Sequence, residues 1–276
     1  MYHKFYQLKE NPFNITADPE FFFLSKSHQE ALSTLQYGIQ ERKGLLMVTG
    51  EVGSGKTTLC RKLLKLADNK THFALVLNPN FSDLELLQMI VHDLGVCTKE
   101  KDKLSLIYSF NEFLLKEANK GHNVVVIIDE AQNLTVAQLE QIRLLSNLET
   151  EKEKLLQIIL LGHPELYHKL QLPELRQVRQ RISVHYELRH LEKKDVKYYI
   201  HHRISKALKQ SRAARDIIFT EQAVETIYHY TQGSPRAINI VCDRALLAGF
   251  VSETFLIDEF IIENCSKEIL CCEYNL

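Results

Sequence analysis

Residues 45–67 read LLMVTGEVGSGKTTLCRKLLKLA, an aliphatic run followed by a glycine-rich turn and then by an amphipathic helical pattern. The turn from Gly50 to Thr57 fits the spacing G-x-x-x-x-G-K-[ST] of a phosphate-binding loop. Its glycines let backbone N–H groups curl around phosphate oxygens, and the positive end of the following helix dipole points at the same anion. The alternative is a glycine-rich turn whose lysine is merely solvated, which would not need the flanking strand and helix.

Each polar side chain of this loop has an expected task. Lys56 would reach the β and γ phosphates of ATP, and the Thr57 hydroxyl would bind Mg²⁺, which prefers oxygen ligands. The motif therefore predicts ATP and Mg²⁺ as cofactors. The predicted nucleotide-binding residues of the loop are Gly50, Glu51, Val52, Gly53, Ser54, Gly55, Lys56, Thr57 and Thr58.

Short aliphatic or β-branched runs recur between amphipathic helical stretches along the first two thirds of the chain. These runs are Leu45 to Thr49, Phe73 to Leu77, Val124 to Ile128, Gln157 to Leu161 and Ile182 to Leu188. The alternation predicts an α/β fold with a five-stranded, mostly parallel sheet. The first four runs are almost continuously apolar, as expected for strands covered on both faces, whereas the alternating fifth run fits a sheet edge.

Beyond about residue 190 the strand-like runs give way to helical spacing. We therefore expect a P-loop α/β domain over residues 1–188 and a small all-helical lid domain over residues 189–276. Within the lid, Gly233 suits the end of one helix, Ser234 the N-cap of the next and Pro235 its first position. Arg236 would then lie in the first turn, where it could close over the phosphates and report nucleotide state.

A second motif, VVVIIDE at residues 124–130, delivers two adjacent carboxylates to the carboxyl end of a predicted strand. In open α/β sheets this end binds ligands. Asp129 would join Thr57 in holding Mg²⁺, and Glu130 would orient and deprotonate a water attacking the γ phosphate. The two acids could instead cap the next helix. A water-activating glutamate favours hydrolysis over transfer to a substrate hydroxyl, so we predict an ATPase rather than a kinase.

Two further polar residues follow strands and could act near the γ phosphate. His163 comes directly after QIILLG and could donate to the attacking water or to the phosphate, although a loop histidine without a role is equally compatible. Asn78 could hydrogen-bond Glu130 and hold it inactive, but an Asn-Pro turn also explains this asparagine.

An arginine cluster, LRQVRQRI, precedes the fifth predicted strand. Guanidinium groups suit the neutralisation of charge on a transferring phosphoryl group, so one arginine could act on the ATP of a neighbouring subunit. Arg181 and Arg176 are the preferred candidates over Arg179. Exposed helix charges that form weak salt bridges are the alternative for each of them.

Composition narrows the function classes. The 276 residues are 45% hydrophobic and carry 34 Lys plus Arg against 35 Asp plus Glu, a formal charge of -1, so no overall positive field favours DNA. No apolar stretch reaches the ~20 residues of a membrane-spanning helix, and no export leader is recognisable. We expect a cytoplasmic protein, with a peripheral position at the inner membrane left open. The six cysteines lack CxxC spacing and predict reduced structural thiols rather than a zinc site.

Several motifs in order resemble the ExeA/GspA family of AAA+ ATPases, associated with type II secretion and related pilus systems. They are FYQLKENPFNITADPEFFFLSKSHQEAL, GIQERKGLLMVTGEVGSGKTTL, DEAQNL, LLSNLET, LGHPEL and GSPRAINIVCDRALLA. The resemblance implies that Asn11, Pro12 and Phe13 lie near the adenine, that Arg236 is the lid arginine called sensor 2, and that His163 takes the sensor 1 position. Glutamine is more usual at that position.

Full-length secretion members of this family typically continue into a membrane segment and a peptidoglycan-binding region, and neither is found in these 276 residues, so direct cell-wall binding is not expected. The chain could be a soluble member of the family or a fragment of a longer protein. The leading hypothesis is a homo-oligomeric, ATP-driven motor or switch that acts on a protein partner in a membrane-associated secretion or pilus complex. The alternative is a transposition helper ATPase that assembles on DNA, which the charge balance disfavours. A scaffold that binds nucleotide without hydrolysis is disfavoured by Glu130.

Overall fold

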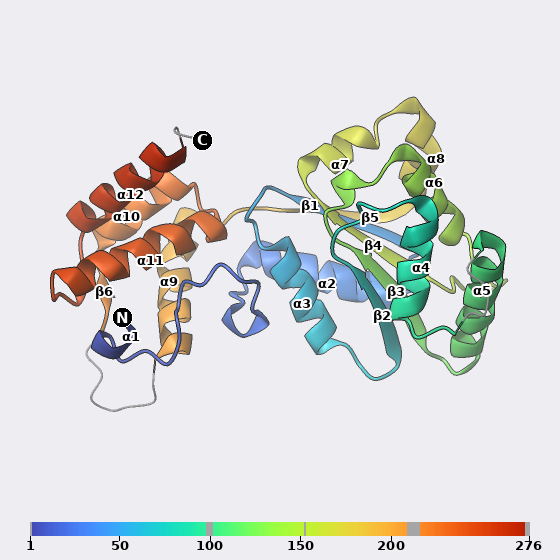
Figure 1. Cartoon of the computed structure of the whole chain (residues 1–276), viewed down its shortest axis with the longest axis horizontal. Coiled ribbons are helices and arrows are strands. Elements are labelled where there is room, and N and C mark those ends of the chain that lie inside the picture. The colour runs from blue at the N-terminus through green and yellow to red at the C-terminus, as the bar shows by residue number, and fades with distance from the viewer. Residues whose placement is uncertain (1, 98–101, 152, 209–215, 274–276) are drawn as a thin grey trace. The chain divides into compact units, whose positions relative to one another are not determined.

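The computed structural model describes residues 2–97, 102–151, 153–208 and 216–273, with side chains as far as residue 267. The chain forms two compact units, which we describe separately. The α/β unit comprises residues 28–51 and 59–188, and the helical unit comprises residues 1–27, 52–58 and 189–276. Figure 1 labels the elements of both units.

The α/β unit is built on a five-stranded sheet in the order β2-β3-β4-β1-β5, and every adjacent pair of strands is parallel (Figure 1). The predicted number of strands is therefore confirmed, as is the edge position of the fifth. The strands are β1 (Leu45–Gly50), β2 (Thr71–Val76), β3 (Asn123–Ile128), β4 (Gln157–Gly162) and β5 (Ile182–Leu188).

The burial of the strand residues explains why most strands could be predicted from the sequence and why the start of one strand was misplaced. β1 and β4 are buried at every position, as nearly continuous apolar runs require. The edge strand β5 alternates between partly buried and exposed residues until the buried Leu188. The other edge strand, β2, begins at Thr71, two residues before the predicted start. The prediction missed Thr71 and His72 because both are polar and only partly buried, so they do not belong to an apolar run.

Helices cover the sheet of the α/β unit on both faces. They are α2 (Lys26–Gln40), α3 (Lys56–Leu66), α4 (Asp83–Asp93), α5 (Lys103–Asn119), α6 (Val136–Leu145), α7 (Pro164–Lys169) and α8 (Arg176–Arg181), with the short η2 (Ala131–Asn133) and η3 (Pro173–Leu175). Capping boxes start two of them, Ser82 with Glu85 at α4 and Thr135 with Gln138 at α6.

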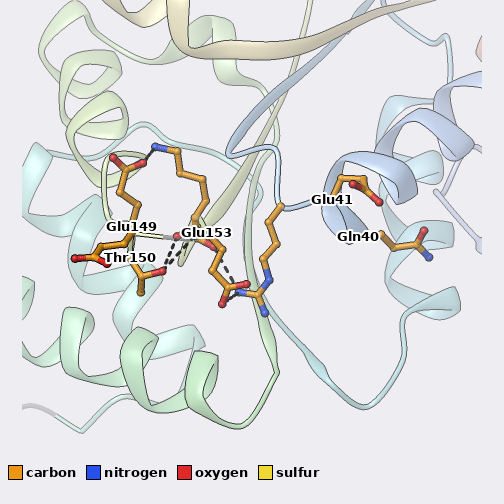
Figure 2. A pocket seen from close by; sticks show the side chains of 8 residues that line it. Gln40, Glu41, Glu149, Thr150 and Glu153 are labelled. Carbon is orange, nitrogen blue, oxygen red and sulfur yellow. Dashed lines mark hydrogen bonds and ion pairs between the residues drawn. The ribbon is translucent and has the colours of Figure 1, made fainter.

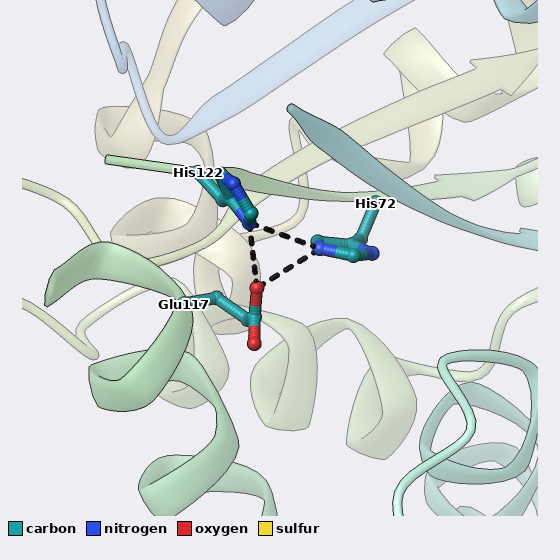
Figure 3. A group of neighbouring side chains, drawn as sticks. All are labelled: His72, Glu117 and His122. Atoms are coloured by element: carbon teal, nitrogen blue, oxygen red, sulfur yellow. Dashed lines mark hydrogen bonds and ion pairs between the residues drawn. The ribbon is translucent and has the colours of Figure 1, made fainter. Parts of the chain in front are cut away.

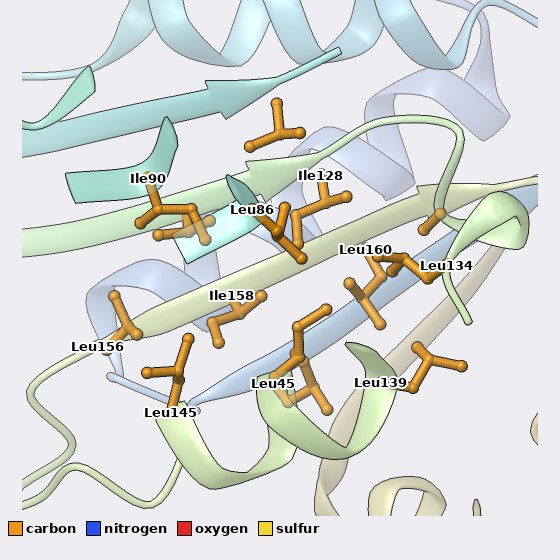
Figure 4. Close-up of a cluster of buried hydrophobic side chains, with 14 of the residues drawn as sticks. Leu45, Leu86, Ile90, Ile128, Leu134, Leu139, Leu145, Leu156, Ile158 and Leu160 are labelled. Atoms are coloured by element: carbon orange, nitrogen blue, oxygen red, sulfur yellow. The ribbon is translucent and has the colours of Figure 1, made fainter. Parts of the chain in front are cut away.

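One face of the sheet packs against α4, α5 and α6. Figure 4 shows part of this cluster, in which Leu86 and Ile90 of α4 and Leu139 of α6 are buried with Ile128 and Ile158 of the strands. Burying such a side chain contributes roughly 1.5–3 kcal/mol.

The opposite face of the sheet meets α2 at a close approach. A Cβ atom on Gly38 would lie 1.9 Å from Leu46 Cδ2, so glycine is required where this helix crosses β1. Alternate strand residues point to opposite faces, so Leu46 faces α2 while Leu45 and Met47 belong to the other cluster.

The helical unit has a hydrophobic core of its own. Its helices are α1 (Tyr2–Phe5), η1 (Pro19–Phe21), α9 (Lys193–Ala207), α10 (Glu221–Thr231), α11 (Pro235–Val251) and α12 (Glu259–Glu273). A short parallel pair, β6 (Ile218–Phe219) with β7 (Leu256–Ile257), joins them. The helical character of the predicted lid is confirmed. The lid also contains this pair of two-residue strands, which are too short to leave a sequence pattern.

The amino-terminal segment packs inside the helical unit. The Tyr6 side chain is fully buried, and its hydroxyl donates a hydrogen bond to the Thr254 carbonyl at 3.0 Å. A Cβ atom on Gly249 would lie 2.5 Å from this hydroxyl, so the glycine makes room for it. The helical unit thus combines three separate segments of the sequence, the last of which begins at Arg189. The division into domains 1–188 and 189–276 stays a prediction.

Among the described residues, no helix combines the length and the apolar character that a bilayer crossing requires.

Candidate functional site

Two carboxylates follow the end of β3, as the sequence predicts. Asp129 is 3% exposed, and its backbone N–H donates to the Val76 carbonyl at 2.8 Å, which extends the pairing of β2 and β3 by one step. Its carboxylate Oδ1 accepts from the Glu130 N–H at 2.9 Å. The Asp129 charge also acts on the nearby Cys60: burial first, and then this negative charge, raise the pKa of the Cys60 thiol to about 12.

Glu130 has an unusual backbone and a held side chain. Its φ of 54° and ψ of 36° lie in the left-handed region, which non-glycine residues seldom occupy outside functional or strained sites. Its Oε2 accepts a hydrogen bond of 2.6 Å from the Gln132 side-chain amide and lies 3.3 Å from His163 Nε2. The side chain is nevertheless 39% exposed, so the carboxylate is oriented and still accessible.

Gln132 connects these groups. Its amide nitrogen donates to Glu130, while its amide oxygen accepts from the backbone N–H of His163 at 3.1 Å. A Cβ atom on Gly162 would lie 3.1 Å from the same amide oxygen, so the glycine before His163 leaves room for it. No role is predicted for Gln132 from the sequence alone, although it lies in the DEAQNL segment two residues after Glu130.

The short helix η2, which carries Gln132, is anchored from α7. Lys169 Nζ donates to the carbonyls of Gln132 and Leu134, the latter at 2.9 Å. The β3 end, η2 and the β4 end are thereby tied together within the α/β unit. The predicted water-activating Glu130 and the predicted sensor His163 lie side by side. Asn78 is exposed, and no hydrogen bond joins it to Glu130 among the described residues.

The phosphate-binding loop shows the backbone that its glycines predict. Gly53 has a φ of 76° and Gly55 a φ of 98°, conformations that favour glycine. Lys56, predicted to reach phosphates, begins α3 and is 5% exposed, and Thr57 follows it in the first turn. This is the strand, loop and helix order that a phosphate site requires.

Arg236 lies beside this loop within the helical unit. A Cβ atom on Gly53 would come within 2.7 Å of Arg236 Cβ and 2.9 Å of Ser234 Oγ. The N–H of Arg236 donates to the Gly53 carbonyl at 3.4 Å. Arg236 stands in the first turn of α11, as predicted, and its side chain is exposed. Ser234 is the N-cap residue, but its side chain makes no cap hydrogen bond and lies close to Gly53 instead.

The residues expected near the adenine make contacts within the helical unit. Asn11 Nδ2 donates to Asp243 at 2.9 Å, and its Oδ1 accepts from the Phe13 N–H at 2.8 Å. Pro12 is buried and its carbonyl accepts from Arg203, while Phe13 is 1% exposed and meets Phe219 edge to face. Their contact with a base stays a prediction.

The three arginines before β5 have different environments. Arg179 donates to the Leu170 carbonyl at 3.3 Å and to Gln171 Oε1 at 2.8 Å, so its guanidinium is occupied. Arg176 and Arg181 are exposed, and neither has a side-chain hydrogen bond or an ion pair among the described residues. Both therefore present charges that a neighbouring chain could meet, and their action between subunits stays a prediction.

The residues present fit ATP and Mg²⁺. The positive φ values of Gly53 and Gly55 give the loop the curl that exposes backbone N–H groups to an anion. The Thr57 hydroxyl and the buried Asp129 carboxylate are oxygen donors, the type of ligand that Mg²⁺ selects.

A polar hollow of about 660 Å³ lies elsewhere on the α/β unit (Figure 2). Arg42 and Glu153 form an ion pair of 3.3 Å on its wall, and Lys154 pairs with Glu149. No predicted site residue lines it, so we assign it no part in nucleotide chemistry.

Comparisons with known proteins agree with this geometry. A sequence profile described as an AAA domain matches residues 39–170. General secretion pathway protein A of Aeromonas hydrophila is 41% identical over 251 residues, which are 91% of this chain and 45% of that protein. The chain thus spans less than half the length of this relative.

Solved structures resemble the fold at low sequence identity. The Aeropyrum pernix ORC2 protein, solved in ADPNP-ADP complexes, has a TM-score of 0.70 at 16% identity, with 95% of this chain and 72% of that chain covered. The Thermotoga maritima RuvB Holliday junction branch migration motor has a TM-score of 0.55 at 17% identity, with 88% and 68% covered. Together, the profile and the relative that matches 91% of the chain confirm the resemblance to the ExeA/GspA family of AAA+ ATPases.

Proposed function

We propose that the chain binds ATP together with Mg²⁺ and hydrolyses it, with Glu130 activating the attacking water. The observation that carries this proposal is the held carboxylate: Glu130 Oε2 lies 2.6 Å from the Gln132 amide nitrogen and 3.3 Å from His163 Nε2, directly after the buried Asp129. Preorganised polar groups around a reacting centre supply much of the rate enhancement of many enzymes.

In the proposed reaction, the water transfers a proton to the Glu130 carboxylate as its oxygen bonds to the γ phosphorus. The bond from that phosphorus to the bridging oxygen breaks, and ADP and inorganic phosphate are released. Lys56 and the backbone N–H groups of the loop bind the phosphates. Thr57 and Asp129 would hold Mg²⁺, whose charge would offset negative charge on the phosphates.

Gln132 and His163 are positioning residues in this proposal. Both contact the same oxygen of Glu130, which leaves Oε1 for the water. His163 is a second candidate donor to the phosphate, the role that the sensor 1 position implies. Arg236, whose backbone packs against the loop at Gly53, is the proposed lid arginine.

The proposal extends to assembly. Arg176 and Arg181 are exposed, and we propose that one of them reaches the ATP of a neighbouring copy in an ATP-dependent homo-oligomer. The exposed cluster supports this arrangement, because an arginine that acts between subunits cannot be occupied within its own chain.

For the cellular role we propose a motor or switch in assembly of a secretion or pilus-type envelope system, cytoplasmic and peripheral at the inner membrane, with a protein partner in that complex. The proposal is supported by the 41% identity to a protein named for the general secretion pathway. The alternative role is that of a transposition helper on DNA, which the formal charge of -1 disfavours.

ATP turnover per subunit, measured against protein concentration with and without DNA at two salt concentrations, tests this proposal. We expect the rate per subunit to rise with concentration and to be unaffected by DNA, because the active unit is an oligomer with a shared arginine. A strong stimulation by DNA that falls with salt would contradict the secretion role and support the transposition role. The absence of turnover in every condition would contradict the ATPase assignment itself.

A further inference from the structure

Three ligand-type side chains meet at the amino-terminal ends of β2 and β3. His72 comes from β2, Glu117 from the last turn of α5, and His122 from the residue just before β3 (Figure 3). Glu117 Oε2 lies 3.0 Å from His72 Nε2 and 2.8 Å from His122 Nδ1, and the two ring nitrogens are 3.4 Å apart. One oxygen and two nitrogens therefore converge on a single point.

We propose that His72, Glu117 and His122 form a binding site for a divalent first-row transition metal ion, with Zn²⁺ as the best match. Ligand atoms ~2.1 Å from such an ion, at angles between octahedral and tetrahedral, are roughly 3.0–3.4 Å from one another. The three observed separations lie close to this range. Imidazole nitrogen suits zinc and its neighbours in the series, whereas Mg²⁺ and Ca²⁺ prefer oxygen.

The surroundings hold the three groups in place. The Glu117 side chain is 5% exposed, and Lys120 Nζ binds its other oxygen, Oε1, at 2.6 Å, which leaves Oε2 for the two histidines. The backbone N–H of His122 donates to the backbone carbonyl of Glu117 at 3.0 Å, and the Arg42 guanidinium donates to the backbone carbonyl of His122 at 2.9 Å. Contacts of this kind orient metal ligands and raise metal affinity.

The site is open on one side. The side chains of His72 and His122 are 40% and 27% exposed, so an ion held by three protein ligands keeps a position for water. A hydrogen-bonded triad without metal is the competing explanation, because each ring N–H could donate to the same carboxylate oxygen. The two explanations differ in one measurable property, which is stoichiometric affinity for a transition metal.

The site is separate from the nucleotide chemistry. His122 precedes the first residue of β3, whereas Asp129 follows the last one, and six strand residues at ~3.3 Å each place the two ends about 20 Å apart. A metal ion here would join the end of α5 to the starts of two adjacent strands. The proposed role is therefore to stabilise this corner of the α/β unit.

Metal titration of the chelator-treated full chain, without nucleotide, tests the proposal. Zn²⁺ and the spectroscopic probe Co²⁺ are added to the wild type and to the variants His72→Ala, His122→Ala and Glu117→Gln. The exposed His92 of α4, in the same unit, provides the matched control His92→Ala. Circular dichroism shows whether each variant folds, and Glu117→Gln keeps the size of the side chain if an alanine variant does not.

We expect one ion per chain in the wild type and in His92→Ala, with a rise in thermal midpoint, and a loss of affinity of ~100-fold or more in the three site variants. X-ray absorption of the Zn²⁺-loaded wild type should show two imidazole ligands. Equal binding by the wild type and the folded site variants, or the absence of stoichiometric binding by the wild type, would overturn the proposal in favour of the hydrogen-bonded triad.

Discussion

The side-chain amide nitrogen of Gln132 donates a hydrogen bond of 2.6 Å to Oε2 of Glu130. The same amide accepts a hydrogen bond from the backbone N–H of His163 through its oxygen, so one side chain connects the proposed general base, Glu130, to the proposed sensor. The amide is fixed in turn because Lys169 binds the carbonyls of η2. The position of Glu130 therefore depends on three elements, β3, η2 and α7.

Gln132→Ala should reduce ATP turnover by roughly tenfold while the affinity for ATP stays within about a factor of two, because the amide orients Glu130 and is not assigned to the nucleotide. Steady-state kinetics and binding of a fluorescent ATP analogue measure the two quantities. The exposed Gln177 of α8 provides the control Gln177→Ala. A large loss of nucleotide affinity with unchanged turnover would contradict the positioning role.

His163→Gln should retain more activity than His163→Ala. A glutamine amide can donate to the Glu130 carboxylate or to phosphate as an imidazole N–H does, and the family resemblance indicates that glutamine is more usual at this position. The turnover of the three proteins at one saturating ATP concentration makes the comparison. Equal turnover in both variants would mean that the hydrogen-bonding capacity of residue 163 is irrelevant.

Gly53→Ala should lower the affinity for ATP by about tenfold or more. A Cβ atom would lie 2.7 Å from Arg236 Cβ, and the φ of 76° disfavours any side chain. Gly95→Ala is the matched control, because Gly95 has a φ of 70° but none of the described residues places an atom within 4 Å of its Cβ position. Calorimetric ATP titration measures the affinity of both variants. Equal losses in both would show that the effect of Gly53→Ala does not arise from its place in the phosphate-binding loop.

Thiol reactivity should differ between Cys60 and Cys97. Burial and the Asp129 charge raise the pKa of Cys60 to about 12, so at pH 8 only about one part in 10⁴ is the reactive thiolate, and the side chain is also inaccessible. Cys97 is exposed. Alkylation followed by peptide mass mapping should label Cys97 before Cys60. Rapid labelling of Cys60 in the folded protein would show that the environment of Asp129 is more open than described.

Features that depend on a short stretch of neighbouring residues could be predicted from the sequence. The five strands of the sheet are long enough to leave a pattern of burial, and the two nucleotide motifs stand at strand ends where a parallel sheet gathers its ligands. The edge position of β5 also followed from alternation within seven residues.

Features that depend on distant contacts were not predictable. The left-handed backbone of Glu130 and the double contact of Gln132 arise from tertiary packing of η2, and no residue pattern encodes them. The packing of Tyr6 depends on Thr254 and Gly249, which are more than 240 residues away. The triad of His72, Glu117 and His122 was likewise invisible, because its members are spread over three separate elements.

The central claim, that Glu130 activates water for ATP hydrolysis, is tested most directly by the turnover and ATP affinity of Glu130→Gln. The exposed Glu165 of α7 supplies the control Glu165→Gln. Glu130→Gln should bind ATP as the wild type does but turn it over ~10²-fold or more slowly, while the control is unchanged. Turnover at the wild-type rate in folded, ATP-binding Glu130→Gln would contradict the central claim.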